Sequence, residues 1–150
     1  MNFQVRIQAL ERQQSPAQLL DTWQDGRVKQ ALITRTLAVR AAHAELFRAG
    51  RYLPLTVQGS QAQRVLAFAR EHQGQWAIVL VPVRVAALLE SSATPLVPAL
   101  QWGDTRVTLP FTPREGKLKG LFSTVEVTHH TELLISAALG DFPVNLFIQT

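Results

Sequence analysis

The chain has 150 residues, of which 47% are hydrophobic, with a formal net charge of +4 and a pI of about 10.3. Its length predicts one domain with a hydrophobic core, to which a helical segment is appended. The absence of cysteine excludes a disulfide scaffold and is typical of the reducing cytoplasm, where we expect the protein to reside. The sequence begins without a signal-peptide pattern and contains no apolar run of membrane-spanning length, so no membrane partner is expected.

The basic pI raises nucleic acid as a partner, but the distribution of the arginines argues against it. Arg27, Arg35, Arg40 and Arg48 fall in one expected helical region without sharing a face. Neither the Gly-aromatic motif of an RNA-binding sheet nor a helix-turn-helix is recognisable. We therefore expect no nucleic-acid partner.

Residues 1–48 are expected to be helical. A first helix is predicted over Asn2–Gln14, with a break at Ser15-Pro16. A second helix begins at Asp25, or one turn earlier at Thr22, because either side chain can accept a hydrogen bond from a backbone N–H of the first turn. No Gly or Pro interrupts residues 28–47, and Gly50 fits a C-terminal stop.

The second helix has apolar residues on two nearly opposite faces. The first stripe is Val28, Leu32, Val39 and Leu46, beside Ala31 and Ala42, and the second is Ile33, Leu37, Ala41 and Ala44. A surface helix normally has one apolar stripe, so two indicate a partner on each side. Without the second partner, this helix should expose an apolar patch that promotes self-association. Arg35 lies within the first stripe and needs a carboxylate, a carbonyl or water, because an unpaired buried charge is costly.

Residues 51–150 are expected to be rich in strands. Period-2 alternation and turn residues predict seven strands, at 51–58, 63–71, 75–83, 104–110, 121–128, 132–139 and 144–149. The strands 63–71 and 75–83 should form a hairpin across Gln73-Gly74. Pro54 lies in the predicted strand 51–58 and favours a position at the sheet edge or at the start of a strand. Seven short strands at this spacing predict an antiparallel β-sandwich, and the Ser/Pro-rich segment 91–98 is expected to be a surface loop.

Several segments resemble maltooligosyl trehalose synthase, of the α-amylase-like glycoside hydrolase superfamily. They are WxDGRxK at 23–29, LAVR at 37–40, ELFRAGRYLPL at 45–55, VLAFAR at 65–70, WAIVLVP at 76–82, WGDTRVTLP at 102–110 and DFPVNLFI at 141–148. The resemblance covers nearly all of the chain from residue 19 onward. It departs from the family at Val83, which separates Pro82 from Arg84, and across 86–98, which matches no family segment.

The resemblance implies an α+β, mostly β chain: residues 1–48 are helices that end a missing (β/α)8 barrel, and residues 51–150 form a C-terminal β-sandwich. The family converts the reducing-end α-1,4 bond of a maltooligosaccharide into an α,α-1,1 bond, which leaves a terminal trehalose unit. Its catalytic carboxylates lie on barrel strands that would precede Met1. No catalytic residue is therefore assigned, no cofactor is implied, and the chain alone is expected to be inactive. The expected partners are the catalytic barrel, whose carboxylates would pair with the arginines, and maltooligosaccharide.

Residue types that could support other chemistry are present but scattered. His129-His130 and Glu132 offer metal-ligand types, yet adjacent residues of a strand point to opposite faces, so at most His130 and Glu132 converge. We therefore expect solvated histidines and no metal site. Asp104 and Glu126 lie on separate predicted strands, and nothing in the sequence brings them together as glycosidase chemistry requires.

The three tryptophans are candidate sugar contacts, because indole faces stack on pyranose rings. Trp102 precedes a turn-like stretch and is the candidate for sugar contact, although packing in the core is the favoured interpretation for all three. Trp23, at the helix start, and Arg35 are the candidate contacts with the barrel. Trp76 begins an apolar strand and should lie in the core.

Three classes of function follow. The first is a non-catalytic C-terminal part of maltooligosyl trehalose synthase that supports the barrel. The second is a stand-alone carbohydrate-binding module, and the third is a basic interaction module. The double apolar stripe of the helix favours the first class, because a free module has no use for a second stripe.

Overall fold

The computed structural model describes residues 14–90, 93–111, 117–128 and 131–150. Its helical part consists of α2 (Pro16–Leu20), the 3-10 turn η1 (Trp23–Asp25), α3 (Arg27–Ala42) and α4 (Ala44–Arg48). Of the helix predicted over Asn2–Gln14, all residues but Gln14 lie outside the described part of the chain. Among the described residues, no helix is both long enough and apolar enough to cross a membrane.

Helix α2 begins where the sequence predicted a break. The Ser15 hydroxyl accepts a hydrogen bond from the Gln18 backbone N–H, and the Gln18 side chain accepts one from the Ser15 N–H. Pro16 takes the first helical position, where a missing N–H costs nothing. Residues 14 and 15 are not helical, as the predicted break requires, and Ser15-Pro16 then starts a new helix through a reciprocal capping box that was not predicted from the sequence.

Helix α3 begins close to the predicted residue and ends earlier than expected. Gly26 precedes it with φ +84°, and the Asp25 carboxylate accepts a hydrogen bond from the Arg27 backbone N–H at 2.8 Å. At His43 the backbone leaves the helical region, and α4 starts one residue later. This bend points the next turn at the sheet, where Leu46 is only 1% exposed.

The strands form two antiparallel sheets. The larger sheet has the order β1-β3-β4-β9-β6-β7, and the smaller has the order β2-β5-β8. Their bounds are β1 Arg51–Pro54, β2 Val57–Gln58, β3 Val65–His72, β4 Gln75–Pro82, β5 Arg106–Thr108, β6 Leu118–Gly120, β7 Glu126–Val127, β8 Glu132–Leu134 and β9 Asn145–Gln149. The connections include the 3-10 turns η2 Ala62–Arg64, η3 Ala86–Leu88 and η4 Ala99–Trp102 and the short helix α5 Ile135–Ala138.

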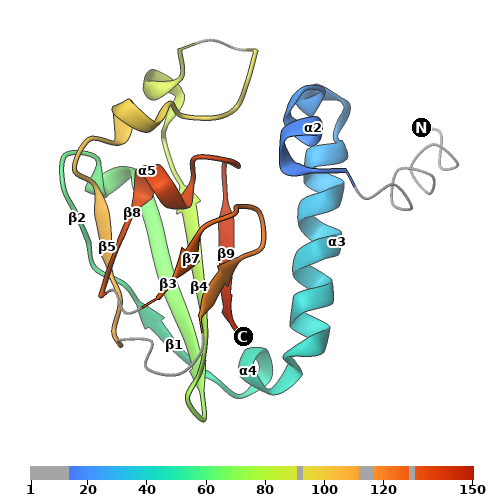
Figure 1. Ribbon diagram of the computed structural model, residues 1–150, viewed down its shortest axis with the longest axis vertical. Helices are drawn as coiled ribbons and strands as arrows, with labels where there is room; N and C mark the ends of the chain where they lie inside the picture. The colour runs from blue at the N-terminus through green and yellow to red at the C-terminus, as the bar shows by residue number, and fades with distance from the viewer. Residues whose placement is uncertain (1–13, 91–92, 112–116, 129–130) are drawn as a thin grey trace, which may run out of the picture.

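Helices and the smaller sheet cover opposite faces of the larger sheet (Figure 1). On one face, Ala67, Ile78 and Leu80 share a core with Val107 and Leu133 of the smaller sheet. On the other face, Leu46 of α4 packs with Ala77 and Leu146, and Val39 of α3 packs against this cluster. The chain is therefore mostly antiparallel sheet with few helices, as the α+β, mostly β fold class predicted.

Three predicted strands differ from the structure. The segment 51–58 divides between the two sheets: β1, which contains Pro54, pairs with β3 at the edge of the larger sheet, and β2 pairs instead with β5. The segment 121–128 contains only β7, while β6 lies before it at residues 118–120. The segment 132–139 is strand only to Leu134 and then turns into α5, whose Ile135 and Ala138 are fully buried at helical spacing.

The predicted hairpin is confirmed. Strands β3 and β4 pair along their full length, from Val65 opposite Pro82 to His72 opposite Gln75. Gln73 and Gly74 have φ of +50° and +82°, the left-handed geometry of a tight two-residue hairpin turn. The Gly74 N–H donates to the Glu71 carboxylate, and this bond, with the Arg51 guanidinium, holds the pKa of Glu71 below its ordinary value of 4.5.

Candidate functional site

Helix α3 packs on one side only. Its first apolar stripe faces the sheet, where Val28 and Leu32 contact one hydrophobic cluster and Val39 contacts another. The second stripe faces solvent, with Ile33 47% and Leu37 55% exposed. No residue of α3 is buried. The predicted exposed apolar patch is therefore present in the structure, and we call Ile33, Leu37 and Ala41 the outer stripe.

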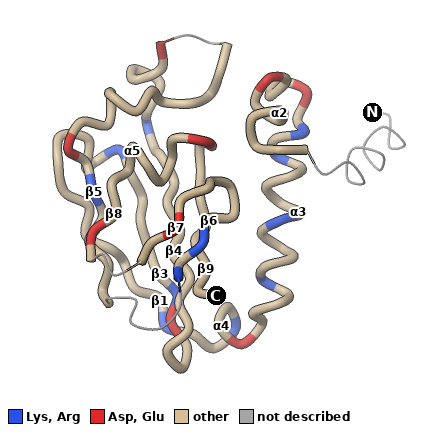
Figure 2. Tube along the Cα trace, viewed as in Figure 1, with Lys and Arg blue, Asp and Glu red and all other residues tan. Residues whose placement is uncertain are grey.

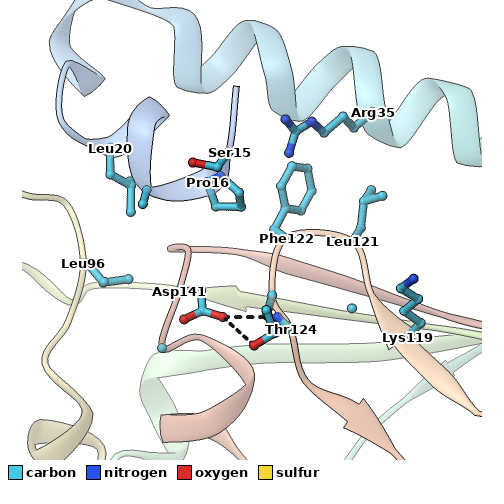
Figure 3. Close-up of a pocket in the computed structure, with 14 residues that line it drawn as sticks. Ser15, Pro16, Leu20, Arg35, Leu96, Lys119, Leu121, Phe122, Thr124 and Asp141 are labelled. Carbon is cyan, nitrogen blue, oxygen red and sulfur yellow. Dashed lines mark hydrogen bonds between the residues drawn. The ribbon is translucent and has the colours of Figure 1, made fainter. Parts of the chain in front are cut away.

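A cleft of about 630 Å³ lies between the helices and the turn that joins β6 to β7. Figure 3 shows Arg35 reaching from α3 toward the ring of Phe122, with Lys119 and Asp141 on the sheet side. This size falls within the range of small-molecule pockets, but most of the lining is apolar. The residues that line it are Ser15, Pro16, Ala17, Leu20, Arg35, Leu96, Lys119, Gly120, Leu121, Phe122, Ser123, Thr124, Gly140 and Asp141.

Arg35 has partners within the chain. Its guanidinium donates to the backbone carbonyl of Gln14 and lies 5.7 Å from the centre of the Phe122 ring. Phe122 in turn stacks on Phe142, with centroids 4.7 Å apart and planes 13° apart. Of the partners that the sequence allowed for Arg35, a carboxylate, a carbonyl or water, the structure supplies a backbone carbonyl of the same chain, together with a cation–π contact. A further contact of Arg35 with a catalytic barrel stays a prediction.

The turn that forms the cleft floor is held by a buried amide. Asn145, at the start of β9, is 2% exposed. Its Oδ1 accepts a hydrogen bond from the Phe122 N–H at 3.2 Å, and its Nδ2 donates to Ser123 Oγ at 2.7 Å and to the Ala138 carbonyl at 2.9 Å. Asp141 supports the same turn, because its carboxylate accepts from the N–H and the hydroxyl of Thr124. The polar groups of the cleft are thus mostly engaged in holding its shape.

The structure removes Trp102 from the candidate sugar contacts. Trp102 is 1% exposed and lies in the core shared by the two sheets, so neither face of its indole is open to a sugar ring. Hydrogen bonds fix the turn that follows Trp102, because the buried Thr105 donates to the Trp102 carbonyl through both its N–H and its hydroxyl. Packing, the favoured interpretation of the sequence, therefore holds for this residue.

Trp23 and Trp76 also have structural contacts. The Trp23 Nε1 donates to the Ala93 carbonyl at 2.9 Å, which ties η1 to the loop before η4. That loop is less exposed than predicted, because Val97 is 5% exposed and joins the main core. Trp76 stacks on Phe111 at 4.2 Å and packs against the same core. Contact of Trp23 with a barrel stays a prediction.

An exposed aromatic pair was not foreseen from the sequence. Tyr52 of β1 lies 5.1 Å from the ring of Phe68 of β3, and 53% of Tyr52 is exposed. Leu66, on the same strand as Phe68 and two residues away, is 49% exposed. These side chains occupy the helix-side face of the larger sheet, beyond the area that α4 covers. The alternation of 51–57 could have indicated this face, but not that it is left uncovered.

The described ranges contain no group of three or more histidines, cysteines or carboxylates that could hold a metal ion. His129 and His130 lie outside those ranges. Asp104 and Glu126 are not brought together, because Asp104 precedes β5 of the smaller sheet and Glu126 lies on β7 of the larger sheet. The Asp104 carboxylate accepts a hydrogen bond from the Ser60 N–H, and the Glu126 carboxylate pairs with Lys117 at 2.9 Å. The Ser60 N–H holds the pKa of Asp104 below its ordinary value, and Lys117 does the same for the pKa of Glu126. Both carboxylates thus have structural hydrogen bonds or ion pairs.

Comparisons with known proteins give one informative relationship. No family model and no curated protein matches this sequence. The fold as a whole is related to part of a large carbohydrate-active enzyme. That enzyme is maltooligosyltrehalose synthase from Arthrobacter ramosus, solved as a point mutant; the likeness has a TM-score of 0.66 at 25% identity and covers 100% of this chain. The chain spans 17% of the length of that enzyme.

Proposed function

We propose that this chain is a non-catalytic C-terminal part of a maltooligosyltrehalose synthase, in which residues 1–48 are the helical end of the catalytic barrel and residues 51–150 form a C-terminal antiparallel β-sandwich. The single observation that carries the proposal is the structural match along the whole chain to 17% of such an enzyme. A segment of this size, matched from end to end, is expected to work as one domain of a larger protein. The reaction, which forms a terminal trehalose unit on maltooligosaccharides, would then be carried out by the catalytic barrel.

The exposed side of α3 supports this proposal. A helix whose inner stripe packs on a sheet and whose outer stripe is about half exposed has an unused apolar surface. Such patches on soluble domains mark contacts with other protein surfaces. A neighbouring domain of the same enzyme would cover it.

Activity tests the proposal. The purified 150-residue chain is expected to form no trehalose unit from maltoheptaose. A full-length chimera, in which this chain replaces the matching part of the Arthrobacter ramosus enzyme, is expected to retain that activity. The control is the same enzyme with the matching part deleted, which should lose thermal stability and activity. Turnover by the isolated chain would contradict the non-catalytic role, and a chimera no better than the deletion would contradict the domain assignment.

Carbohydrate binding is the second candidate function, and the exposed Tyr52–Phe68 pair is the observation that favours it. If this chain is a binding module, maltoheptaose should bind with a millimolar or lower Kd, and Tyr52→Ala should abolish binding because the exposed ring is the stacking surface. Calorimetric titration measures this, with Leu100→Ala, an exposed apolar residue elsewhere, as the matched control. Absence of binding by the unaltered chain would leave the domain role as the better account.

A further inference from the structure

We propose that the outer stripe of α3, together with the basic flank formed by Lys29 and Arg40, is a docking surface for an apolar face that carries carboxylates at its rim. The inference rests on the proposed function in one respect: the partner is taken to be the remaining part of the same enzyme. It goes further by stating the chemistry that the partner must present to this helix.

The first observation is the placement of the stripe. Ile33, Leu37 and Ala41 follow one another at intervals of four residues, so they lie in a row on one side of α3. The residues that contact the sheet lie on the opposite side, at Val28, Leu32 and Val39. The stripe therefore points away from the rest of the domain, where a second layer can cover it without disturbing the fold.

The second observation is the charge of the helix. Residues 27–42 contain Arg27, Lys29, Arg35 and Arg40 and no Asp or Glu, as the blue positions along α3 in Figure 2 show. Arg27 pairs with Asp25 at 2.6 Å, and Arg35 is engaged in the cleft. Lys29 and Arg40 are exposed and make no ion pair with any residue in the described parts of the chain.

The two observations coincide in space. Lys29 and Arg40 are eleven residues apart, which is about three helical turns, or about 16 Å, and places them on the same flank of α3. By the same geometry Arg40 lies about 20° and Lys29 about 40° around the helix from Ile33, on the side away from Leu37, so this flank adjoins the outer stripe. A row of apolar side chains bordered by two cations that have no ion-pair partner among the described residues is complementary to an apolar surface bordered by carboxylates. A second copy of this chain would bring the same two cations and no carboxylate from α3.

The test uses a helical peptide of defined chemistry as the partner surrogate. One peptide has leucines at i, i+4 and i+8 with glutamates beside them, and its counterpart has lysines in place of the glutamates. The full 150-residue chain is expected to bind the glutamate peptide and not the lysine peptide, with affinity that falls as salt rises, since exposed charge pairs are screened. Fluorescence anisotropy of labelled peptide measures the Kd.

Variants locate the surface. Lys29→Glu and Arg40→Glu are each expected to weaken the glutamate peptide by about threefold, the effect of one exposed ion pair. Leu37→Ser should weaken it further through lost apolar contact, and circular dichroism checks that each variant keeps its helix. Arg84→Glu, an exposed cation outside α3 with the same change in net charge, is the matched control and should leave the Kd unchanged.

Equal binding of both peptides, or equal effects of Arg84→Glu and Lys29→Glu, would overturn the inference. Self-association that excludes the glutamate peptide would overturn it in favour of a second copy as the occupant. None of these readouts depends on trehalose formation, so the chimera can fail while the surface chemistry holds, and the reverse.

Discussion

Gly59→Ala is expected to lower the free energy of unfolding by about 2–5 kcal/mol, from backbone strain plus overpacking. Gly59 has φ +105°, which alanine adopts only with strain. A Cβ at this position would lie 2.6 Å from Thr105 Cα and 2.8 Å from the Asp104 carbonyl oxygen. Both are backbone atoms in the two residues that precede β5, and these cannot move without disturbing the smaller sheet. Urea unfolding followed by circular dichroism measures the loss.

Gly74→Ala is the matched control for this prediction. Gly74 also has a positive φ, +82°, but a Cβ there would meet no heavy atom within 4 Å. Only the backbone strain should remain, about 1–2 kcal/mol. If the two variants lost equal stability, the close approach of the β2–η2 loop to β5 would not be what requires glycine at position 59.

Asn145→Ala is the second change for which we expect a large effect, a loss of about 3 kcal/mol in the free energy of unfolding. The substitution removes three hydrogen bonds and leaves the Phe122 N–H and the Ala138 carbonyl without this partner in a buried site. Because the turn that Asn145 holds carries Phe122, the Arg35–Phe122 contact should loosen as well. Urea unfolding gives the stability.

Ser123→Ala provides the comparison for Asn145. It removes only the hydrogen bond between Ser123 Oγ and Asn145 Nδ2, so about 1 kcal/mol should be lost. A loss for Asn145→Ala no larger than that for Ser123→Ala would contradict the view that the amide organises the turn. Such a result would assign the shape of the cleft to the stacked Phe122–Phe142 pair instead.

The contacts behind these two predictions, at Gly59 and at Asn145, differ in how far the sequence indicates them. Gly59 lies in a turn that the tripeptide Gln58-Gly59-Ser60 indicates, but its close approach to Thr105 joins segments more than forty residues apart. Asn145 has no sequence signal at all, since it falls inside a predicted strand where a polar residue would be expected to face solvent. Its burial follows from the turn it meets across the sheet.

Local pattern and turn chemistry were sufficient for the start of α3 to within one or two residues, although its N-cap is Gly26 and not Asp25 or Thr22, and for the β3–β4 hairpin and the class of fold. They were also sufficient for the two-faced character of α3, because helical periodicity depends only on residue spacing. The boundaries that failed share a cause. Residues 51–58 change from one sheet to the other, and residues 132–139 keep a strand-like pattern beyond the point where the pairing with β5 ends, and only the packed structure shows where each ladder begins and ends.

By itself, the sequence determined the helical region of α3 and α4, most strands, the exposed outer stripe and a resemblance that the structural match at 25% identity supports, but it missed α2 and α5. Only the tertiary structure decided that Trp102 is buried, that Tyr52 is exposed, and that Arg35 finds its carbonyl and an aromatic ring within the chain. The physical reason is that period and turn type are properties of neighbouring residues. The exposure of a side chain and the identity of its hydrogen-bond partners depend on which surfaces distant in sequence pack together. In this protein, the packing of two sheets and a helix decides both.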